Sequence, residues 1–301
     1  MAPPSVGYHH VDVFAELPYT GNSLAVFVDP PTLSVDRMLR ITRELRHFES
    51  IFVGRRTDNV IHARVFDLIE ELGFAGHPVM GAAAVLHLRS AVASGEELRW
   101  TFELPARTVR VTTSGDDAGR VFALLDQGRP ELVARADAID RVAVAASLGL
   151  SPDELREDLP TEVHSTGLRY LIVPVRDADV LGRAHIRRAD FDAFLAALGA
   201  EFVYVLDVDS LQGRHWNNDG VREDVATGSA AGCVAAYLMR HGHACHGRPS
   251  ALGQGRFVGR PSTITITAYG RPDEVERVIV GGTVTPVGTG TLHALPAEGR
   301  P

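Results

Sequence analysis

The chain has 301 residues, of which 45% are hydrophobic and 23% charged, and its formal net charge is −8. This length suggests one large domain or two domains of about 150 residues each. The negative charge disfavours nucleic acid and anionic membranes as main partners, because both need a positive field. No apolar run is long enough for a spanning helix and the N-terminus lacks a secretory pattern, so we expect a cytoplasmic protein.

The basic residues other than histidine are all arginine, since the sequence contains no lysine. Schiff-base chemistry needs a lysine amine, so pyridoxal-phosphate enzymes and lysine aldolases are excluded. A Walker A phosphate loop, which ends in Lys-Ser/Thr, is excluded as well. The two cysteines, Cys233 and Cys245, are too few for a disulfide framework or a four-cysteine zinc site.

Strands and helices are predicted along the whole chain from the periodicity of apolar residues. The expected strands cover 7–14, 23–28, 50–53, 60–66, two or three segments within 98–125, and then 170–175, 202–207, 263–268, 275–281 and 283–287. The expected helices cover about 34–45, 136–148 and 189–198, with two more after the turns described next. The polar stretch 126–130 predicts a crossover to a second half of similar organisation.

Two segments share one pattern, a Gly-containing turn that runs into an apolar helix rich in small residues. They are AGHPVMGAAAVL (75–86) and TGSAAGCVAAYL (227–238). Any two buried alanine-rich helices look alike, so the match can be coincidental. If the repeat is real, the protein consists of two similar α+β halves, and both helix N-termini face a cleft between them.

The start of each of these helices offers a site for a small anion. A helix N-terminus presents unpaired N–H groups and a partial positive charge, and glycine lets a ligand approach the backbone. Gly76-His77 and Gly228-Ser229 stand at these starts, so a carboxylate is the simplest ligand. His77 can exchange a proton near neutral pH, although a lone turn histidine is often only solvated. Ser229 can donate a hydrogen bond to a substrate.

Two carboxylates are candidates for the chemistry. Asp224 stands before the second turn, where it is either a helix cap or a group that binds a substrate amine or orients His77. Glu49 lies in HFESIFV, where it either ends the preceding helix and points to water or is partly buried. Burial favours the neutral form of a carboxyl group, which suits a general acid–base near pH 7.

The segment RHGHACHG contains a group of metal-binding residue types within six positions: His241, His243, Cys245 and His246. A metal site is one interpretation. The spacing matches no known ligand pattern, however, and the segment follows a helix as a loop. We therefore expect no metal here.

Six blocks of the sequence together resemble the PhzF family of phenazine biosynthesis. In chain order they are VDVFAELPYTGNSLAVF, RELRHFESIFV, ELGFAGHPVMGAAAVL, REDVATGSAAGCVAAYL, GQGRFVGRPSTITI and VGGTVTPVGTG, from about Tyr8 to Gly290. The resemblance implies the α+β fold of diaminopimelate epimerase, with two similar lobes, each a central helix wrapped by an open β-barrel, and an active site in the cleft between them. Residues 1–128 with about 286–301 would form the N-terminal lobe and 129–285 the C-terminal lobe.

The resemblance also implies roles for individual residues. Glu49 matches the glutamate that takes a proton from one carbon and returns it to another. The residues that match those holding the substrate and assisting the transfer are His77, Asp224 and Ser229, with the amides around Gly76 and Gly228 for the carboxylate and Asn22 in a turn near the site.

The sequence departs from related patterns at several positions, and four of these departures bear on the expected site. Epimerases of this fold use one cysteine from each turn, but this chain has Ala75 and Thr227 there, which disfavours two-base racemisation. Asp67 replaces the threonine of the family's Phe-Thr-Pro and adds a carboxylate near the expected cleft. Val225 replaces a proline and is expected to loosen the backbone before the second turn.

These observations predict a cofactor-independent isomerase that shifts a proton on a small cyclic or unsaturated amino acid or carboxylic acid. The reaction would be a double-bond or keto–enol isomerisation in secondary-metabolite biosynthesis, of a phenazine-type compound or a proline-derived antibiotic. The resemblance also implies a homodimer. The alternatives are a non-catalytic small-acid binding protein and, less well supported, an epimerase.

Overall fold

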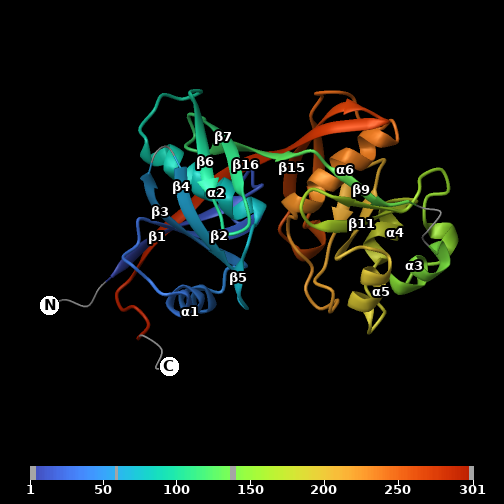
Figure 1. Ribbon diagram of the computed structural model, residues 1–301, viewed down its shortest axis with the longest axis horizontal. Coiled ribbons are helices and arrows are strands. Elements are labelled where there is room, and N and C mark those ends of the chain that lie inside the picture. The colour runs from blue at the N-terminus through green and yellow to red at the C-terminus, as the bar shows by residue number, and fades with distance from the viewer. Residues whose placement is uncertain (1–4, 58–59, 136–139, 298–301) are drawn as a thin grey trace. The chain divides into compact units, whose positions relative to one another are not determined.

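The computed structural model describes residues 5–57, 60–135 and 140–297 (Figure 1). The described chain divides into two compact units. Unit 1 consists of the residues up to 126 together with those from 281 onward, and unit 2 consists of residues 127–280. None of the described helices is long and apolar enough to cross a membrane.

Unit 1 is a run of paired strands with two helices that pack against them. Its elements are β1 (Val6–Val13), β2 (Asn22–Val28), α1 (Val35–Leu45), β3 (Glu49–Thr57), β4 (Val60–Phe66), β5 (Glu71–Leu72), α2 (Gly76–Arg89), β6 (Glu97–Glu103), β7 (Thr108–Gly115) and β8 (Val121–Gly128). The strand order is β1-β2-β3-β4-β6-β7-β8, and β16 (Glu274–Leu292) pairs antiparallel with β1. Strands β2 and β3 run parallel, with Leu24 opposite Glu49.

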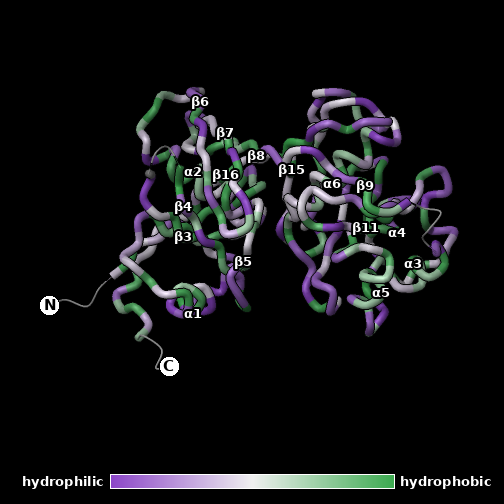
Figure 2. Tube along the Cα trace, viewed as in Figure 1, coloured by the Kyte–Doolittle hydropathy of each residue, from purple (hydrophilic) through white to green (hydrophobic). Residues whose placement is uncertain are grey.

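Helix α2 contacts β1, β2, β3, β6 and β7, and almost all of its residues are buried. A helix that is apolar on all sides is typical of a core position, and the α2 tube is mostly white to green in Figure 2. Helix α1 is different, because it is amphipathic and only one side is buried. Its Met38 and Ile41 pack in a cluster with Phe27 and Phe52, which belong to β2 and β3.

The approach of α2 to the strands depends on Gly81. A Cβ atom at this position would lie 2.4 Å from Leu24 Cδ2, and 3.2 and 3.3 Å from the methyl groups of Val13 and Val11. These three side chains are fully buried, so they have little room to move. Glycine costs about 1 kcal/mol relative to alanine inside a helix. The close contact with β1 and β2 is the physical reason for a glycine here.

We predict that Gly81→Ala lowers the free energy of unfolding by about 1–2 kcal/mol, because the overpacking cost exceeds the gain in helix propensity. Urea denaturation followed by circular dichroism measures this change. Gly182→Ala in α4 (Ala178–Arg183) is the control, since its Cβ would meet only the ring of the part-exposed Phe257, at 3.3 Å. A more stable Gly81→Ala protein would contradict the packing role of this glycine.

Unit 2 combines a second run of strands with several short helices. Its elements are β9 (Glu131–Ala134), α3 (Arg141–Ser147), β10 (Glu162–Ser165), β11 (Arg169–Val175), α4, α5 (Phe191–Ala197), β12 (Phe202–Asp207), β13 (Gln212–Arg214), α6 (Gly228–Arg240), β14 (Ser250–Gln254) and β15 (Ser262–Arg271), with 3₁₀ turns at Pro152–Glu154 and Arg256–Val258. The strand order is β16-β15-β14-β13-β12-β11-β10-β9. The almost fully buried helix α6 contacts β10, β11 and β15.

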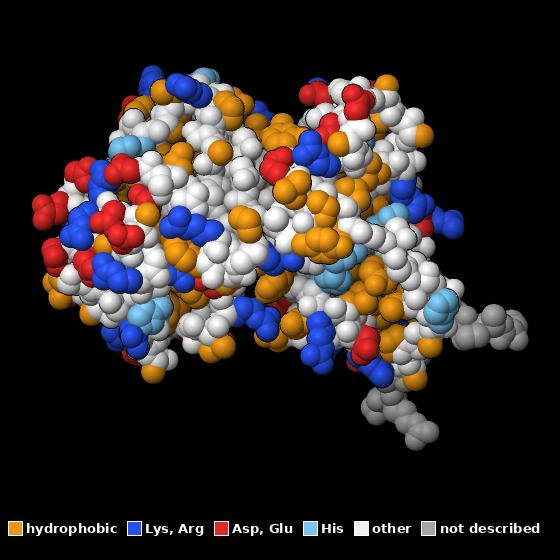
Figure 3. Space-filling model, turned by 180° about the vertical axis from the view of Figure 1, so that it is seen from behind, with side chains coloured by type: hydrophobic (Ala, Val, Ile, Leu, Met, Phe, Trp, Pro, Cys, Tyr) orange, Lys and Arg blue, Asp and Glu red, His pale blue; other side chains and the backbone are white. Residues whose placement is uncertain are grey.

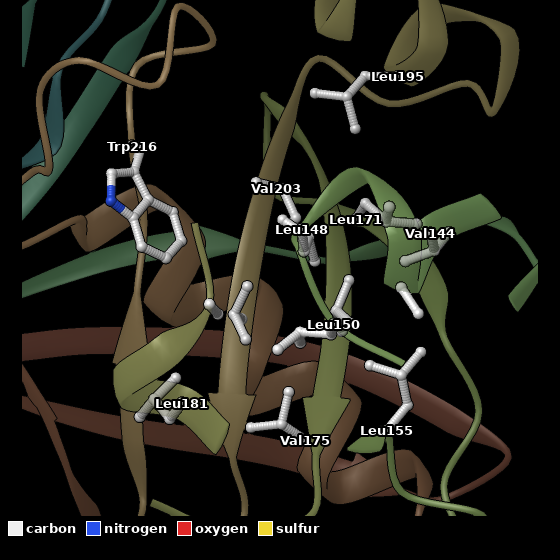
Figure 4. Packing of buried hydrophobic residues seen from close by; sticks show 14 of the residues in the cluster. Val144, Leu148, Leu150, Leu155, Leu171, Val175, Leu181, Leu195, Val203 and Trp216 are labelled. Atoms are coloured by element: carbon white, nitrogen blue, oxygen red, sulfur yellow. The ribbon is translucent and has the colours of Figure 1, made fainter. Parts of the chain in front are cut away.

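The short helices of unit 2 enclose a separate hydrophobic core. Leu148, Leu171 and Val203 point toward one another in Figure 4, and Trp216 lies at one side of the cluster. The outer surface over these helices carries charges of both signs (Figure 3). Many of them form ion pairs, such as Arg156 with Asp158 at 2.7 Å and Arg183 with Glu154 at 2.6 Å. In each of these pairs one side chain is mostly buried and the other is exposed.

The mixed α/β class is confirmed, and both glycine turns do run into buried helices. The strands do not form a clean barrel in each half, because β16 belongs to the strand paths of both units and all described strands belong to one sheet, with β5 paired to β4 at the side of the main path. The two predicted strands at 275–281 and 283–287 are therefore one strand, β16. Gly281 lies inside this strand and does not break it. A Cβ atom at this position would lie 2.5 Å from the side chain of Leu124 in β8. The glycine marks a close approach between two strands.

Other predictions differ from the structure in detail. The stretch 126–130 is not only a crossover, because β8 continues to Gly128 and β9 begins at Glu131. Part of the expected helix at 136–148 lies outside the described residues, and the rest is helical from Arg141 to Ser147. The strands at 60–66 and 202–207 match as predicted.

Candidate active site

The first candidate residues meet at the N-terminus of α2, within unit 1. Glu49 begins β3 and His77 is the second residue of α2. Glu49 Oε2 and His77 Nε2 are 2.9 Å apart, and their side chains are only 20% and 8% exposed. The two atoms touch without being well aligned for a hydrogen bond, which is common in active sites without substrate. The structure thus excludes a Glu49 that ends the preceding helix and points to water.

Sequence register explains why these two side chains meet. His77 and Gly81 are four residues apart and therefore share one face of α2. Gly81 packs against Leu24 of β2, and Leu24 is the direct partner of Glu49 on β3. Paired residues on neighbouring strands point to the same side of a sheet. Glu49 must therefore face α2 at the level of His77.

Asn22 lies on the same side of the sheet. It begins β2, two residues before Leu24, and it is 1% exposed. The preceding Gly21 has a positive φ of 61°, and a Cβ there would lie 2.4 Å from the carbonyl oxygen of Val13. Only glycine fits this turn without strain. The Gly-Asn pair thus places a buried amide on the strand next to Glu49.

The two glycine-turn helices have matching N-termini. Ala75 is the N-cap of α2 and Thr227 is the N-cap of α6, and neither side chain caps its helix. Gly76 and Gly228 follow as first helical residues, and His77 and Ser229 follow as second residues. Ala75 and Thr227, the two positions that the sequence comparison matches to the epimerase cysteines, are therefore both N-caps. Cys233 lies inside α6, where burial raises the pKa of its thiol to about 12.

In unit 2, a polar network surrounds the start of α6. Thr227 donates its hydroxyl to Asp224 Oδ2 at 2.6 Å and accepts a hydrogen bond from Gln254 Nε2 at 2.9 Å. Gln254 Oε1 accepts from the backbone N–H of Thr227 at 3.1 Å. The hydroxyl of Thr227 therefore serves Asp224 and Gln254 instead of capping the helix. Asp224 thus stabilises the turn through its hydrogen bond with Thr227, and its side chain lies beside the first turn of α6.

Sequence reasoning missed two buried aromatic residues next to this network. Tyr170 Oη is 2.7 Å from Ser229 Oγ, and burial raises the pKa of Tyr170, so the phenol is neutral. His215 donates its Nδ1–H to the carbonyl of Val203 at 2.8 Å. Burial lowers the pKa of His215, while the charge of Asp224 opposes this shift. In the sequence, Tyr170 looks like a core residue of a strand, and His215 follows the three-residue strand β13. No sequence pattern therefore marked either residue as part of the site.

The structure shows the local roles of two residues that depart from the family pattern. Asp67 Oδ1 accepts hydrogen bonds from the backbone N–H groups of Ile69 and Glu70, at 2.7 and 2.6 Å. This carboxylate therefore closes a turn before β5. Val225 does not loosen the backbone. Its side chain is 2% exposed, and its carbonyl oxygen accepts a hydrogen bond from Ser262 Oγ at 3.1 Å.

The histidines after α6 are not gathered into a metal site. His241 Nε2 contacts Glu162 Oε2 at 2.9 Å, while His246 Nδ1 accepts from the backbone of Gly270 at 3.0 Å. Over residues 5–57, 60–135 and 140–297, no group of three or more metal-binding side chains has the geometry of a metal site. His164 Nε2 approaches the same oxygen of Glu162 at 3.0 Å. Glu162 is thus a buried carboxylate held by two imidazoles.

Burial alone would raise the pKa of Glu162, but hydrogen bonds from His164 and His241 outweigh it and lower that pKa to about 2. A carboxyl whose pKa is lower in the folded state stabilises the fold above its unfolded pKa. This contribution is lost as the pH falls from about 4.5 toward 2. We predict that Glu162→Gln lowers the free energy of unfolding by about 1–2 kcal/mol at pH 7, and that the difference from the parent shrinks at pH 3.5.

Urea denaturation at the two pH values measures this effect. Glu157→Gln, an exposed neighbour in sequence, is the matched control and should change stability little at either pH. A Glu162→Gln deficit that stays constant between pH 7 and pH 3.5 would show that the carboxylate charge is not what the two histidines stabilise.

Comparison with known proteins shows what class of protein has this fold and these helix N-termini. A family model described as phenazine biosynthesis-like protein (PhzC-PhzF) matches residues 11–290. A trans-2,3-dihydro-3-hydroxyanthranilate isomerase from Pseudomonas fluorescens is 32% identical, over 95% of this chain and 98% of that protein. The Pseudomonas aeruginosa isomerase of the same name is 33% identical, over 91% and 95% of the two chains.

Solved structures agree with this result. A structure described as a predicted epimerase from P. aeruginosa is 45% identical, with a TM-score of 0.86 over 95% of this chain and 99% of that one. A PhzF-family protein from Bacillus anthracis shares the fold at 24% identity, with a TM-score of 0.83 over 96% and 99%. The class is that of small-molecule isomerases with an epimerase-like mixed α/β fold. The chain belongs to the PhzC-PhzF family, and it is an isomerase.

Proposed function

We propose that the chain moves a proton between two carbons of a small unsaturated or cyclic amino acid or carboxylic acid, with Glu49 as the proton carrier and without a cofactor. The observation that supports this most directly is the partly buried contact of 2.9 Å between Glu49 and His77. A carboxylate that is shielded from water and close to a histidine can accept a proton from carbon and keep it for redelivery.

The proposed reaction needs no other reactant. The Glu49 carboxylate takes a proton from a substrate carbon, and the electrons of the broken C–H bond delocalise into the neighbouring double bond or carbonyl group. The carboxylic acid then returns the proton to the other end of the delocalised system, so that a double bond has moved. His77 can donate a hydrogen bond to the carboxylate of Glu49 or accept one from its acid form. It would therefore assist both half-reactions.

The substrate carboxylate is proposed to bind at helix N-termini. The amides around Gly76 and Gly228 belong to helices that no N-cap side chain closes, and such ends attract anions. Asn22 is proposed to bind the substrate beside Glu49. From the family resemblance, we propose that Asp224 and Ser229 of unit 2 act on the same substrate, with Ser229 oriented by Tyr170.

The family relatives suggest a first substrate to test. Three of them are named trans-2,3-dihydro-3-hydroxyanthranilate isomerases, and this cyclic amino acid has the ring double bonds that the proposed proton shift requires. We propose a substrate of this kind in phenazine-type biosynthesis, or a proline-derived intermediate in antibiotic biosynthesis. We also propose a homodimer in the cytoplasm, and sedimentation equilibrium tests the dimer.

We predict that Glu49→Gln lowers turnover of trans-2,3-dihydro-3-hydroxyanthranilate by about 10²–10⁴-fold, because an amide cannot carry the proton. Proton NMR in D₂O measures both the loss of substrate and the deuterium incorporated into the product. Glu44→Gln is the matched control, since Glu44 is exposed on α1 and should tolerate the same change. Full turnover and exchange by Glu49→Gln would falsify the proposed role.

The same NMR assay separates the proposed reaction from epimerisation. A proton shift places deuterium at a new carbon and moves a double bond, whereas epimerisation places it at the original carbon and inverts it. Asp224→Asn and Ser229→Ala are expected to reduce turnover of the same substrate, while leaving the circular dichroism spectrum unchanged. If both variants turn over the substrate as the parent does, unit 2 takes no part in the chemistry.

A further inference from the structure

The proposed reaction leaves one buried histidine of unit 2 without a role. His215 directly follows β13, and it is only 6% exposed. Its Nδ1 atom lies 2.8 Å from the carbonyl oxygen of Val203. A carbonyl oxygen can only accept a hydrogen bond, so Nδ1 must carry the proton. Burial lowers the pKa of His215 and favours the neutral ring. In that ring Nε2 is an unprotonated acceptor.

His215 lies directly opposite Asp224. Trp216 and Glu223 form an antiparallel bridge, and the backbone N–H of Asp224 donates to the carbonyl oxygen of His215 at 2.9 Å. Residues that face each other in an antiparallel pair point to the same side. The side chains of His215 and Asp224 therefore share one side of the sheet, while Trp216 packs in the hydrophobic core on the other side.

The side that His215 shares with Asp224 is the one turned toward the start of α6. The ring of Tyr170 meets the ring of His215 edge to face, with 5.6 Å between the ring centroids. The hydroxyl of the same tyrosine contacts Ser229, the second residue of α6. Asp224 contacts the N-cap residue Thr227. His215 thus belongs to the group of polar residues around this helix start.

The Nε2 atom of His215 lacks a donor. In the part of the chain that the structure describes, it makes no hydrogen bond or ion pair. It is not among the fully enclosed side-chain atoms without a partner, so it keeps some accessible surface. Asp224 and Ser229 beside it are part-exposed. Buried polar groups rarely stay unsatisfied. An imidazole acceptor and a carboxylate on the same side of the sheet call for a donor that both can share.

We propose that His215 is a specificity-determining residue that binds the amino group of the substrate, with Nε2 as hydrogen-bond acceptor and the Asp224 carboxylate as counter-charge. An ammonium group has three N–H donors and no acceptor, so it can serve both side chains at once. A carboxylate in the same place would meet two acceptors and be repelled. The inference rests on the proposed function, because it takes the substrate to be an amino acid.

Two stable probes test this binding without turnover. trans-2-Aminocyclohexanecarboxylate has an ammonium group beside a carboxylate on a six-membered ring, and cyclohexanecarboxylate lacks only the amine. Neither has a ring double bond to move. His215→Asn removes the Nε2 acceptor, while its amide can still donate to Val203. We expect this change to weaken binding of the amino probe about tenfold, as for one lost hydrogen bond to a charged donor. Binding of cyclohexanecarboxylate should be unchanged. NMR titration measures both affinities.

His185→Asn is the matched control. His185 also has its Nδ1 atom 2.8 Å from a backbone carbonyl oxygen, that of Arg183, but at an exposed place in unit 2. It should leave both affinities unchanged. An equal loss for both probes in His215→Asn would indicate a packing role, and no loss would exclude the contact; either result overturns the inference. Since turnover is not measured, these outcomes are independent of whether Glu49→Gln is active.

Imidazole ¹⁵N resonances of the parent protein give a second test that needs no variant. Nuclear Overhauser contacts with the rings of Tyr170 and Phe202, both with centroids 5.6 Å from that of His215, assign the signals. We expect Nε2 to be unprotonated at pH 7, and its resonance to shift in a saturable way with the amino probe and several-fold less with cyclohexanecarboxylate. A ring protonated on both nitrogens, or an Nε2 signal that the amino probe does not move, contradicts the proposal.

Discussion

The contact between Glu49 and His77 depends on how closely α2 packs against β2. Helix α2 is buried on all sides, so its position is set by shape and not by polar anchors. At Gly81 the helix backbone comes so near to Leu24 that no side chain fits. Leu24 is paired with Glu49, and Gly81 lies one turn after His77. A shift of the helix would therefore move His77 away from the carboxylate, and the proposed proton carrier would lose a geometry in which small displacements matter.

Helix α6 of unit 2 begins in the same way as α2 of unit 1, but the polar side chains around its first turn are different. In α2 the residue after the first glycine is a histidine that contacts a glutamate, whereas in α6 it is a serine that contacts Tyr170. Around α6 the side chains of Asp224, Thr227 and Gln254 hold the turn by hydrogen bonds. The two helix starts are alike in backbone and unlike in chemistry. This difference is consistent with the roles that we propose, with proton transfer at the start of α2 and substrate binding at the start of α6.

Much of the fold and of the candidate site could be predicted from local sequence. The caps, glycines and apolar periodicity placed α1, α2 and α6 near their observed bounds, and the two helix starts were identified by Gly76-His77 and Gly228-Ser229. What local patterns could not supply was long-range packing. Tyr170 and His215 became neighbours of Ser229 and Asp224 only through the fold, and Gly281 looked like a strand end because its partner Leu124 is far away in sequence. The role that we propose for Glu49 comes from the whole-chain resemblance, since its own segment left that role open.

Strand β16 has a consequence for how this family can change in evolution. Its nineteen residues pair with β1 near one end and belong to the strand path of unit 2 as well. Side chains alternate along a strand, so one inserted or deleted residue would exchange the buried and exposed faces of everything on one side of the change. Relatives should therefore vary in length in turns such as 90–96, while the stretch from Glu274 to Leu292 keeps a constant length and diverges by substitution alone.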